Sequence, residues 1–324
     1  MLVPIYEPNA GRAQLWSVSF PSGKRERITN DVSDYSMNLD MTPDGKSAVA
    51  LESNLVSNIW ASTTAGVSRL EQITSEDFPM FEVIDTNSGK LLVSSPGQIW
   101  IMDANGTARA SFAKLPIRHI RRCGTLMVAL VRQEGGPRLV RFDGDGMHLA
   151  SLATGSPDSP SCSPDGKFVF YKDTSPPQRI LRVPIEGGAP VEIAKIPGDG
   201  PAGDVEISED GKFLAFAWDQ YKPVPTMHFS VISSTDGSLL KSFPSPSGVY
   251  DLRWSPDETA LQYVLTRDGV GNLWEQPLSG GTSRQLTKFT SGLIFGFNWS
   301  RGGKRLLLAR GSVTSDVVLL TNLR

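Results

Sequence analysis

The chain has 324 residues, a net charge of −2 and no block of like charge, so nucleic acid is not expected as the main partner, because it would need a basic face. No stretch approaches the roughly 20 apolar residues of a membrane-spanning helix. Residues 1–9 contain prolines and lack the basic start and apolar run of a signal peptide. We therefore expect a soluble chain without membrane insertion. It would be cytoplasmic by default, or extracytoplasmic if joined to an anchored parent.

The composition favours an all-β fold. Glycine (31) and proline (23) are plentiful, and turn dipeptides separate short apolar runs. The clearest example is the tight turn over residues 163–167, Ser-Pro-Asp-Gly-Lys, followed by the apolar strand over residues 168–171. Proline, aspartate and glycine each suit their place in a β-turn.

The same turn recurs along the whole chain. A repeat of about 40–45 residues built from four strands is typical of a propeller blade. We therefore predict one seven-bladed β-propeller of four-stranded antiparallel blades over residues 1–324, with residues 1–20 as an extra strand or the remnant of a preceding region. The repeat turns lie near residues 45, 89, 124, 166, 211, 258 and 303, and Glu258 stands where the other six units have glycine.

Each unit has the same order of strands. A first strand with period-two alternation, as in residues 250–254, precedes the turn, and the most apolar strand follows it. A third strand often reads Asn-Ile-Trp or Asn-Leu-Trp, as in residues 58–60 and 272–274. A short polar fourth strand, as in residues 284–287, suits an exposed sheet edge.

The two ends of the chain complement each other. The N-terminal part has third- and fourth-strand patterns first, and the C-terminal part ends on a third-strand pattern at residues 316–320. We therefore predict that strands from the two ends pair and close the ring. Residues 25–30 are expected to be the donated fourth strand. Residues 14–20 would then lie outside the ring or belong to a preceding blade.

The motifs Pro-Asp-Gly-Lys, Asn-Ile-Trp and Arg-Gln-Leu-Thr resemble the TolB-type, WD-like β-propeller repeat of bacteria. The segment from Gly269 to Arg324 is similar to propellers attached to bacterial serine/threonine kinases. The resemblance covers nearly the whole chain. It implies the fold and a place in a bacterial signalling or envelope protein, and it does not name a partner, because such propellers have many roles.

No motif for catalysis or cofactor binding is present: the sequence has no G-x-S-x-G, H-E-x-x-H or phosphate loop. We expect no cofactor and no metal. Residues 143–146, Asp-Gly-Asp-Gly, are interpreted as a hairpin turn rather than a calcium loop. Cys123 and Cys162 are expected to be unpaired thiols, with a disulfide between them as the alternative.

A group of aromatic and charged residues falls on the predicted loops. In a propeller, the connections between blades and those between second and third strands share one face around the channel mouth, and aromatic side chains beside charges suit a binding surface. The alternative is that several of them are simply the first buried residue of a strand. The candidate partner-binding residues are Asp34, Tyr35, Phe81, Tyr221, Tyr250 and Phe295.

The first functional hypothesis is a monomeric, non-catalytic scaffold or sensor that binds a protein or peptide at this face. The alternative is a propeller enzyme of the lyase or hydrolase type with a polar site at the channel mouth. An enzyme would need a convergent cluster of titratable residues there. Three scattered histidines, His119, His148 and His228, make this less favoured.

Overall fold

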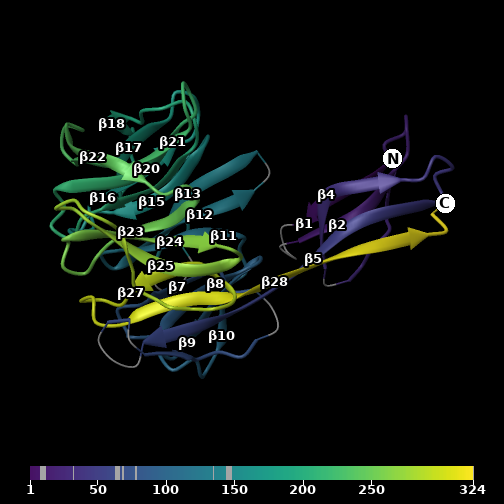
Figure 1. Ribbon diagram of the computed structural model, residues 1–324, viewed down its shortest axis with the longest axis horizontal. Helices are drawn as coiled ribbons and strands as arrows, with labels where there is room; N and C mark the ends of the chain where they lie inside the picture. Colours follow the sequence, from purple (N-terminus) through teal and green to yellow (C-terminus); the bar gives the residue numbers. More distant parts are fainter. Residues whose placement is uncertain are drawn as a thin grey trace.

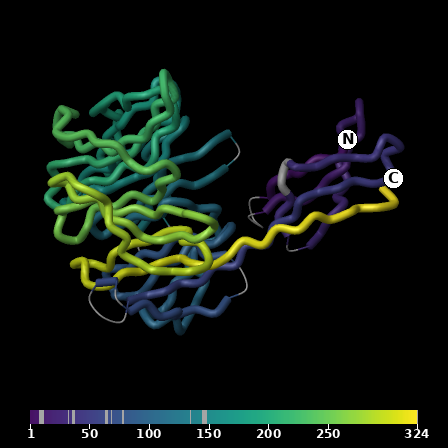
Figure 2. Tube along the Cα trace, in the orientation of Figure 1, coloured from purple at the N-terminus to yellow at the C-terminus, as the bar shows by residue number. Residues whose placement is uncertain are grey.

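The computed structural model describes residues 1–7, 12–31, 33–62, 66–67, 69–76, 79–133, 135–143 and 148–323. These residues form strands and turns. Figure 1 shows two parts, a large ring of sheets and a small lobe. Two long strands, β5 (Ser47–Ser62) and β28 (Leu306–Thr321), run from the ring into the lobe. Figure 2 shows that both chain termini lie in the lobe.

The ring is a β-propeller. Five of its blades are four-stranded antiparallel sheets made of consecutive strands. They are β7 (Glu82–Asp85), β8 (Leu91–Ser95), β9 (Gln98–Met102) and β10 (Ala110–Ala113); β11 (Ile117–Cys123), β12 (Leu126–Gln133), β13 (Gly136–Phe142) and β14 (Ala150–Ala153); β15 (Pro157–Cys162), β16 (Phe168–Asp173), β17 (Arg179–Pro184) and β18 (Val191–Lys195); β19 (Ala202–Ile207), β20 (Phe213–Gln220), β21 (Thr226–Ser233) and β22 (Leu239–Ser245); and β23 (Val249–Trp254), β24 (Ala260–Arg267), β25 (Val270–Pro277) and β26 (Arg284–Gln285).

The sixth blade closes the ring with strands from distant parts of the sequence. Its first two strands are β27 (Leu293–Trp299) and the start of β28, and its third and fourth are the end of β5 and β6 (Leu70–Gln72). Leu308 of β28 lies opposite Trp60 of β5, and Trp60 lies opposite Gln72 of β6. Closure by pairing strands from the two ends of the sequence is thus confirmed.

Apolar clusters between neighbouring blades hold the ring together. One packs Ile59 of the closing blade against Val83 and Leu91 of the next blade, and another packs Leu308 against Leu273 of the preceding one. Four further clusters join the remaining neighbours in the same way. In the part of the chain that the structure describes, six blades therefore meet at six apolar interfaces.

The propeller fold is confirmed, but the predicted number of seven blades is not. The first repeat along the chain, with its turn at Gly45, is divided between the ring and the lobe. Its first two strands, β4 (Asp34–Met41) and the start of β5, lie in the lobe, whereas its third and fourth strands complete the closing blade. Residues 25–27 are not the donated fourth strand either, because they form β3 and pair with β2 in the lobe.

The recurring turn owes its geometry to one aspartate and one glycine. In the unit at Gly166, the Ser163 hydroxyl and the Lys167 backbone N–H both donate to the Asp165 carboxylate, at 2.6 and 3.1 Å. Gly166 adopts a φ of +70°, which glycine reaches without strain. The turns join first to second strands, and we call their side of the ring the turn face. Connections between second and third strands lie on the opposite side, the loop face.

The lobe consists of two small sheets packed on each other. One contains β1 (Leu2–Glu7), β2 (Arg12–Val18) and β3 (Arg25–Arg27). The other contains β4, residues 47–53 of β5 and residues 315–321 of β28. Leu15, Tyr35 and Ala50 form its core, with Val318 and Leu320 packed against them. The lobe leaves the ring on the loop face, because β28 starts at a turn-face turn.

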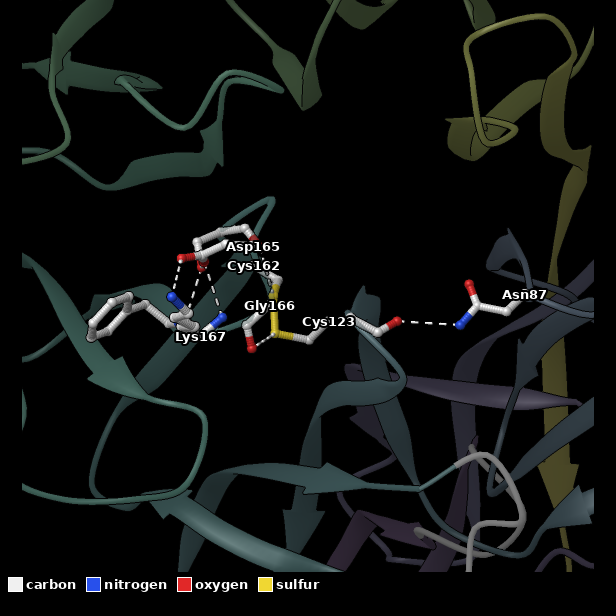
Figure 3. Close-up of a disulfide and its surroundings, with 9 residues drawn as sticks. Asn87, Cys123, Cys162, Asp165, Gly166 and Lys167 are labelled. Carbon is white, nitrogen blue, oxygen red and sulfur yellow. Dashed lines mark hydrogen bonds and ion pairs between the residues drawn. A yellow bond between two sulfur atoms is a disulfide. The ribbon is translucent and has the colours of Figure 1, made fainter.

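Cys123 and Cys162 form a disulfide, so the expectation of two unpaired thiols is wrong (Figure 3). Each cysteine ends the first strand of its blade, and the two blades are neighbours, which brings the Cα atoms within 5.3 Å. Their positions are 39 apart in the sequence, and this distance along the chain hides their proximity in space.

Of the predicted hairpin turn at 143–146, residues 144–146 lie outside the described residues. Within the described part of the chain, no helix has the length and apolar character needed to cross a membrane.

Candidate functional site

The first strands of the six blades stand side by side around the centre of the ring, and their side chains form two layers. In the layer nearer the loop face, a side chain of one strand accepts a hydrogen bond from the backbone of the next. Asp204 accepts from the Leu252 N–H at 3.2 Å, and Asp251 from the Phe297 N–H at 2.6 Å. This layer, which we call the acidic layer, contains Glu82, His119, Ser159, Asp204, Asp251 and Gly296.

His119 lies between two carboxylates of the neighbouring strands. Its Nδ1 is 3.4 Å from Glu82 Oε1, and its Nε2 is 3.6 Å from Asp158 Oδ1. The buried Lys172 ammonium lies 3.0 Å from Asp158 and also donates to the Ala202 carbonyl at 2.6 Å. At this level of the ring, one lysine and one histidine therefore lie among four carboxylates, Glu82, Asp158, Asp204 and Asp251, and Asp251 also pairs with Arg253.

The carboxylates of the acidic layer differ in their pKa values. Burial raises the pKa of Asp251 to about 6, and Arg253 only partly offsets that effect. Burial also opposes ionisation of Asp204, but neighbouring His119, Arg253 and Arg121 outweigh it and lower the Asp204 pKa to about 2. The site thus holds one carboxylate that is costly to ionise beside another that ionises readily.

A second layer of buried ions lies beneath the first, toward the turn face. Glu206 is its centre: Arg121 and Arg253 both donate to its Oε1, at 3.3 and 2.7 Å, and Ser161 donates to its Oε2 at 3.0 Å. Arg253 also reaches Asp251 at 2.6 Å. Buried ion pairs add little net stability but fix geometry when each charge is paired. This layer joins strands β11, β15, β19 and β23 and supports the acidic layer.

Two cavities flank these layers. One, of about 260 Å³, opens beside His119 and Asp158 and is also lined by Arg118 and Arg132. The other, of about 270 Å³, lies on the turn-face side beneath Arg121 and Glu206.

Three of the predicted site residues meet at the rim of the ring. The Phe81 and Phe295 rings are in edge-to-face contact, with centroids 6.3 Å apart. The Tyr250 hydroxyl donates to the Ile294 carbonyl, next to Phe295, at 2.5 Å, and the Tyr250 side chain stays 37% exposed. Phe81, Tyr250 and Phe295 come from three neighbouring blades, and we call them the aromatic rim.

The other predicted residues lie elsewhere. Tyr221 is 51% exposed in the loop after β20 and is anchored by its backbone N–H to Asp199. Asp34 and Tyr35 are on β4, in the lobe, and so are not on the rim of the ring. Tyr35 is only 4% exposed, and its hydroxyl donates to Asp31 at 2.8 Å, so it is a core residue of the lobe.

Sequence reasoning missed the acidic layer and the ions beneath it. A signal was present for the second layer, because its residues Ser161, Glu206 and Arg253 each precede the turn residue of their unit by five positions. Polar residues at one position of a repeat are expected to gather at one level of the channel. The three histidines do not gather: His119 is on β11, His148 lies in the loop before β14, and His228 on β21 stacks on Trp218.

No protein-family model matches the chain, and no curated protein matches it. Solved structures do. A protein of Agrobacterium tumefaciens described as TolB is 17% identical, with a TM-score of 0.64 over 79% of this chain and 99% of that one. TolB from Acinetobacter baumannii is 12% identical, with a TM-score of 0.55 over 94% and 78%. A chain of a nidogen/laminin complex is 10% identical, with a TM-score of 0.56 over 80% and 98%. The chain thus has the fold of a TolB-like β-propeller.

Proposed function

We propose that this chain is a non-catalytic, protein-binding propeller, monomeric when free, which takes a polypeptide segment at its loop face. The aromatic rim would hold the apolar part of the segment, and the acidic layer would receive a lysine or arginine side chain. The observation that carries the proposal is the position of Asp204 and Asp251 within the ring beside the exposed Tyr250.

The charges favour a cationic group over an anionic one. The four carboxylates named above have two basic neighbours at the same level. Beneath them, Arg121 is held by Glu206, and Arg253 is shared between Glu206 and Asp251. A cation placed beside Asp251 would offset the cost of ionising that buried carboxylate. Binding should therefore tighten as the pH rises through about 6, since Asp251 must lose its proton.

One of the similar solved structures supports a binding role, without assigning a partner. The nidogen/laminin structure is that of a complex, so a similar propeller is found there with a bound protein. Aromatic side chains at a rim are common anchors of such interfaces, and truncating one typically costs about 2 kcal/mol or more of binding free energy.

A second candidate is an enzyme of the lyase or hydrolase type. His119 sits between Glu82 and Asp158 beside the 260 Å³ cavity, and histidine–carboxylate pairs are common general bases. The binding role is favoured because the described ring brings one histidine, not a cluster, to its first strands.

The test is a selection of random-sequence peptides on the immobilised protein, followed by affinity measurements by fluorescence anisotropy between pH 5 and pH 8. We expect the selected peptides to contain lysine or arginine. Asp251→Asn and Tyr250→Ala should each weaken their binding at least tenfold, while the lobe variants Asp316→Asn and Phe20→Ala should not. Peptides without basic residues, or equal binding by Asp251→Asn, would refute the proposed site.

The same purified protein tests the second candidate function, an enzyme. If the protein turns over members of a panel of chromogenic esters and lactones, and His119→Ala abolishes that turnover while leaving the peptide affinity unchanged, the ring is an enzyme.

A further inference from the structure

The small lobe leaves one face of a sheet uncovered. On the sheet of β4, β5 and β28, side chains alternate between two faces, and one face packs on β2. The opposite face, which we call the open face, is apolar and accessible: Val317 is 73% exposed, Leu319 65% and Val49 44%. Val49 lies directly opposite Leu319 in the strand pairing, so these side chains form one continuous surface.

We propose that the lobe is an open segment of a second β-propeller, and that its open face and the free edge of β28 are covered by further four-stranded repeats of the same type. The ring described above would then be an insertion between the second and third strands of one blade of that second propeller. The proposal does not depend on the proposed binding function.

The first support is the turn between β4 and β5. The Thr42 hydroxyl and the Lys46 N–H donate to the Asp44 carboxylate at 2.6 and 3.1 Å, and Gly45 has a φ of +68°. These are the contacts of the Gly166 turn in the ring, where the turn joins the first strand of a blade to the second. β4 and the start of β5 are therefore first and second strands.

The second support is a polar clamp between third and fourth strands. In the ring, the Thr287 hydroxyl donates to Asn272 at 2.9 Å and accepts from the Leu273 N–H at 2.9 Å. In the lobe, the Thr29 hydroxyl donates to Gln14 at 2.9 Å and accepts from the Leu15 N–H at 2.9 Å.

The backbone hydrogen bonds next to these threonines also match between the lobe and the ring. Ile28 donates to Leu15 as Leu286 does to Leu273, both at 2.8 Å. β2 and the segment after β3 are thus a third and a fourth strand.

These assignments make the lobe two adjacent, incomplete blades. β1, β2 and β3 are the second, third and fourth strands of one blade, and β4, β5 and β28 are the first, second and third strands of the next. Among the described residues, no strand pairs with the outer edge of β1 or with the outer edge of β28 beyond residue 311. An unpaired edge of this length is a template for another strand.

The ring shows what covers the equivalent surfaces. There, second and third strands are buried on both faces: Ala217 of β20 and Val231 of β21, 4% and 5% exposed, pack with Leu252 of the following blade. The open face of the lobe carries side chains of the same kind on the same strands of the repeat. A following blade is the partner whose shape and chemistry fit both this face and the β28 edge.

The test extends the full chain at the position where a fourth strand would begin. The Leu323 N–H donates to Lys46 as the Leu278 N–H donates to Thr259 at the end of a third strand in the ring. A copy of residues 280–289, GGTSRQLTKF, is therefore appended after residue 324, with a scrambled version of these ten residues as the control. Exchange of the amide hydrogens of residues 312–321 is followed by mass spectrometry.

We expect the repeat-derived extension to slow this exchange at least tenfold and the scrambled extension to leave it unchanged. Equal exchange in both would overturn the proposal. Light scattering of the unextended chain tests a second copy as the alternative cover. A monomer supports the proposal, whereas a dimer that Leu319→Asp dissociates would assign the open face to self-association instead.

Discussion

At the scale of single residues, Glu258 shows how a repeat tolerates a departure from its pattern. It occupies the place of a glycine and keeps the left-handed backbone, with a φ of +56°. For a residue with a Cβ that conformation costs about 1–2 kcal/mol. The Glu258 carboxylate also accepts a hydrogen bond from the Glu209 N–H of the neighbouring turn, which offsets part of that cost.

We expect Glu258→Gly to raise the free energy of unfolding by about 0.5–1 kcal/mol, since relief of backbone strain exceeds the added flexibility of the unfolded chain. Chemical denaturation measures the change. Glu258→Gln, which keeps both the strain and a hydrogen-bond acceptor, should be nearly neutral. Destabilisation by glycine would show that the contact with Glu209 outweighs the strain.

The buried Asp251 predicts a pH dependence of stability. Its pKa of about 6 lies above the value of about 3.9 in an unfolded chain, so the folded state binds the proton more tightly. The stability linked to that proton is present below about pH 4 and is lost as the pH rises through 6, by about 3 kcal/mol. Asp204, with its lowered pKa of about 2, acts in a separate window, below about pH 4.

Asp251→Asn removes this titration. The free energy of unfolding of the variant, relative to the unsubstituted protein, should therefore rise by about 2 kcal/mol between pH 4 and pH 7. Urea denaturation at a series of pH values measures it, with the exposed Asp316→Asn as the control. A difference that stays flat over this range would mean that Arg253 fully compensates the burial of Asp251.

The sequence predicted correctly the residues whose conformation depends on their near neighbours in the chain. It did not predict the burial of residues whose surroundings come from distant strands. The positive φ at Glu258 follows from its alignment with glycines and is observed. The burial of Tyr35 depends on Leu15 and on Val318, which are far from it in sequence. The same limit hid the acidic layer, because each of its members comes from a different blade.

At the scale of elements, the turn pattern predicted most strands, but it did not predict that β5 is one strand of 16 residues. Residues 52–54, Glu-Ser-Asn, resemble a polar loop between a second and a third strand. β28 pairs with β5 along its whole length, from Leu307 with Ala61 to Thr321 with Ser47, and that pairing keeps the segment extended. Residues 52–54 pair with a strand that is more than 250 residues away, which leaves no local signal in the sequence. The division of the first repeat, with its turn at Gly45, was therefore not predictable.

The disulfide is the second element-level feature with a measurable consequence. Cross-linking two positions 39 residues apart restricts the unfolded chain, and the chain-entropy relation gives about 4 kcal/mol for a loop of that length. We expect Cys123→Ser/Cys162→Ser to lose roughly that amount in chemical denaturation under oxidising conditions. Under reducing conditions, the gap between variant and unsubstituted protein should nearly vanish. An unchanged gap would attribute the loss to packing around Cys123.

At the scale of the whole molecule, the ring and the lobe have separate cores. The ring is held by the six inter-blade clusters, and the lobe by the cluster around Leu15, Tyr35 and Ala50. Strands β5 and β28 are common to both, and Arg132 of the ring lies over the Tyr6 ring of the lobe at 5.7 Å. Two cores of such different size predict two unfolding transitions, with the lobe unfolding first.

This architecture gives a definite outcome for removal of residues 1–30. If those residues closed the ring, their loss would lower the stability of the whole molecule. In the structure they form β1, β2 and β3 of the lobe, whereas the ring is closed by residues 57–62 and 70–72. We therefore expect calorimetry of the truncated chain to show the first, smaller transition lost and the main transition moved by no more than a few degrees.

Retention of Asp251-dependent peptide binding by the truncated chain would place the binding site on the ring alone. A large drop in the main transition would instead mean that the lobe and the ring fold as one cooperative unit through β5 and β28.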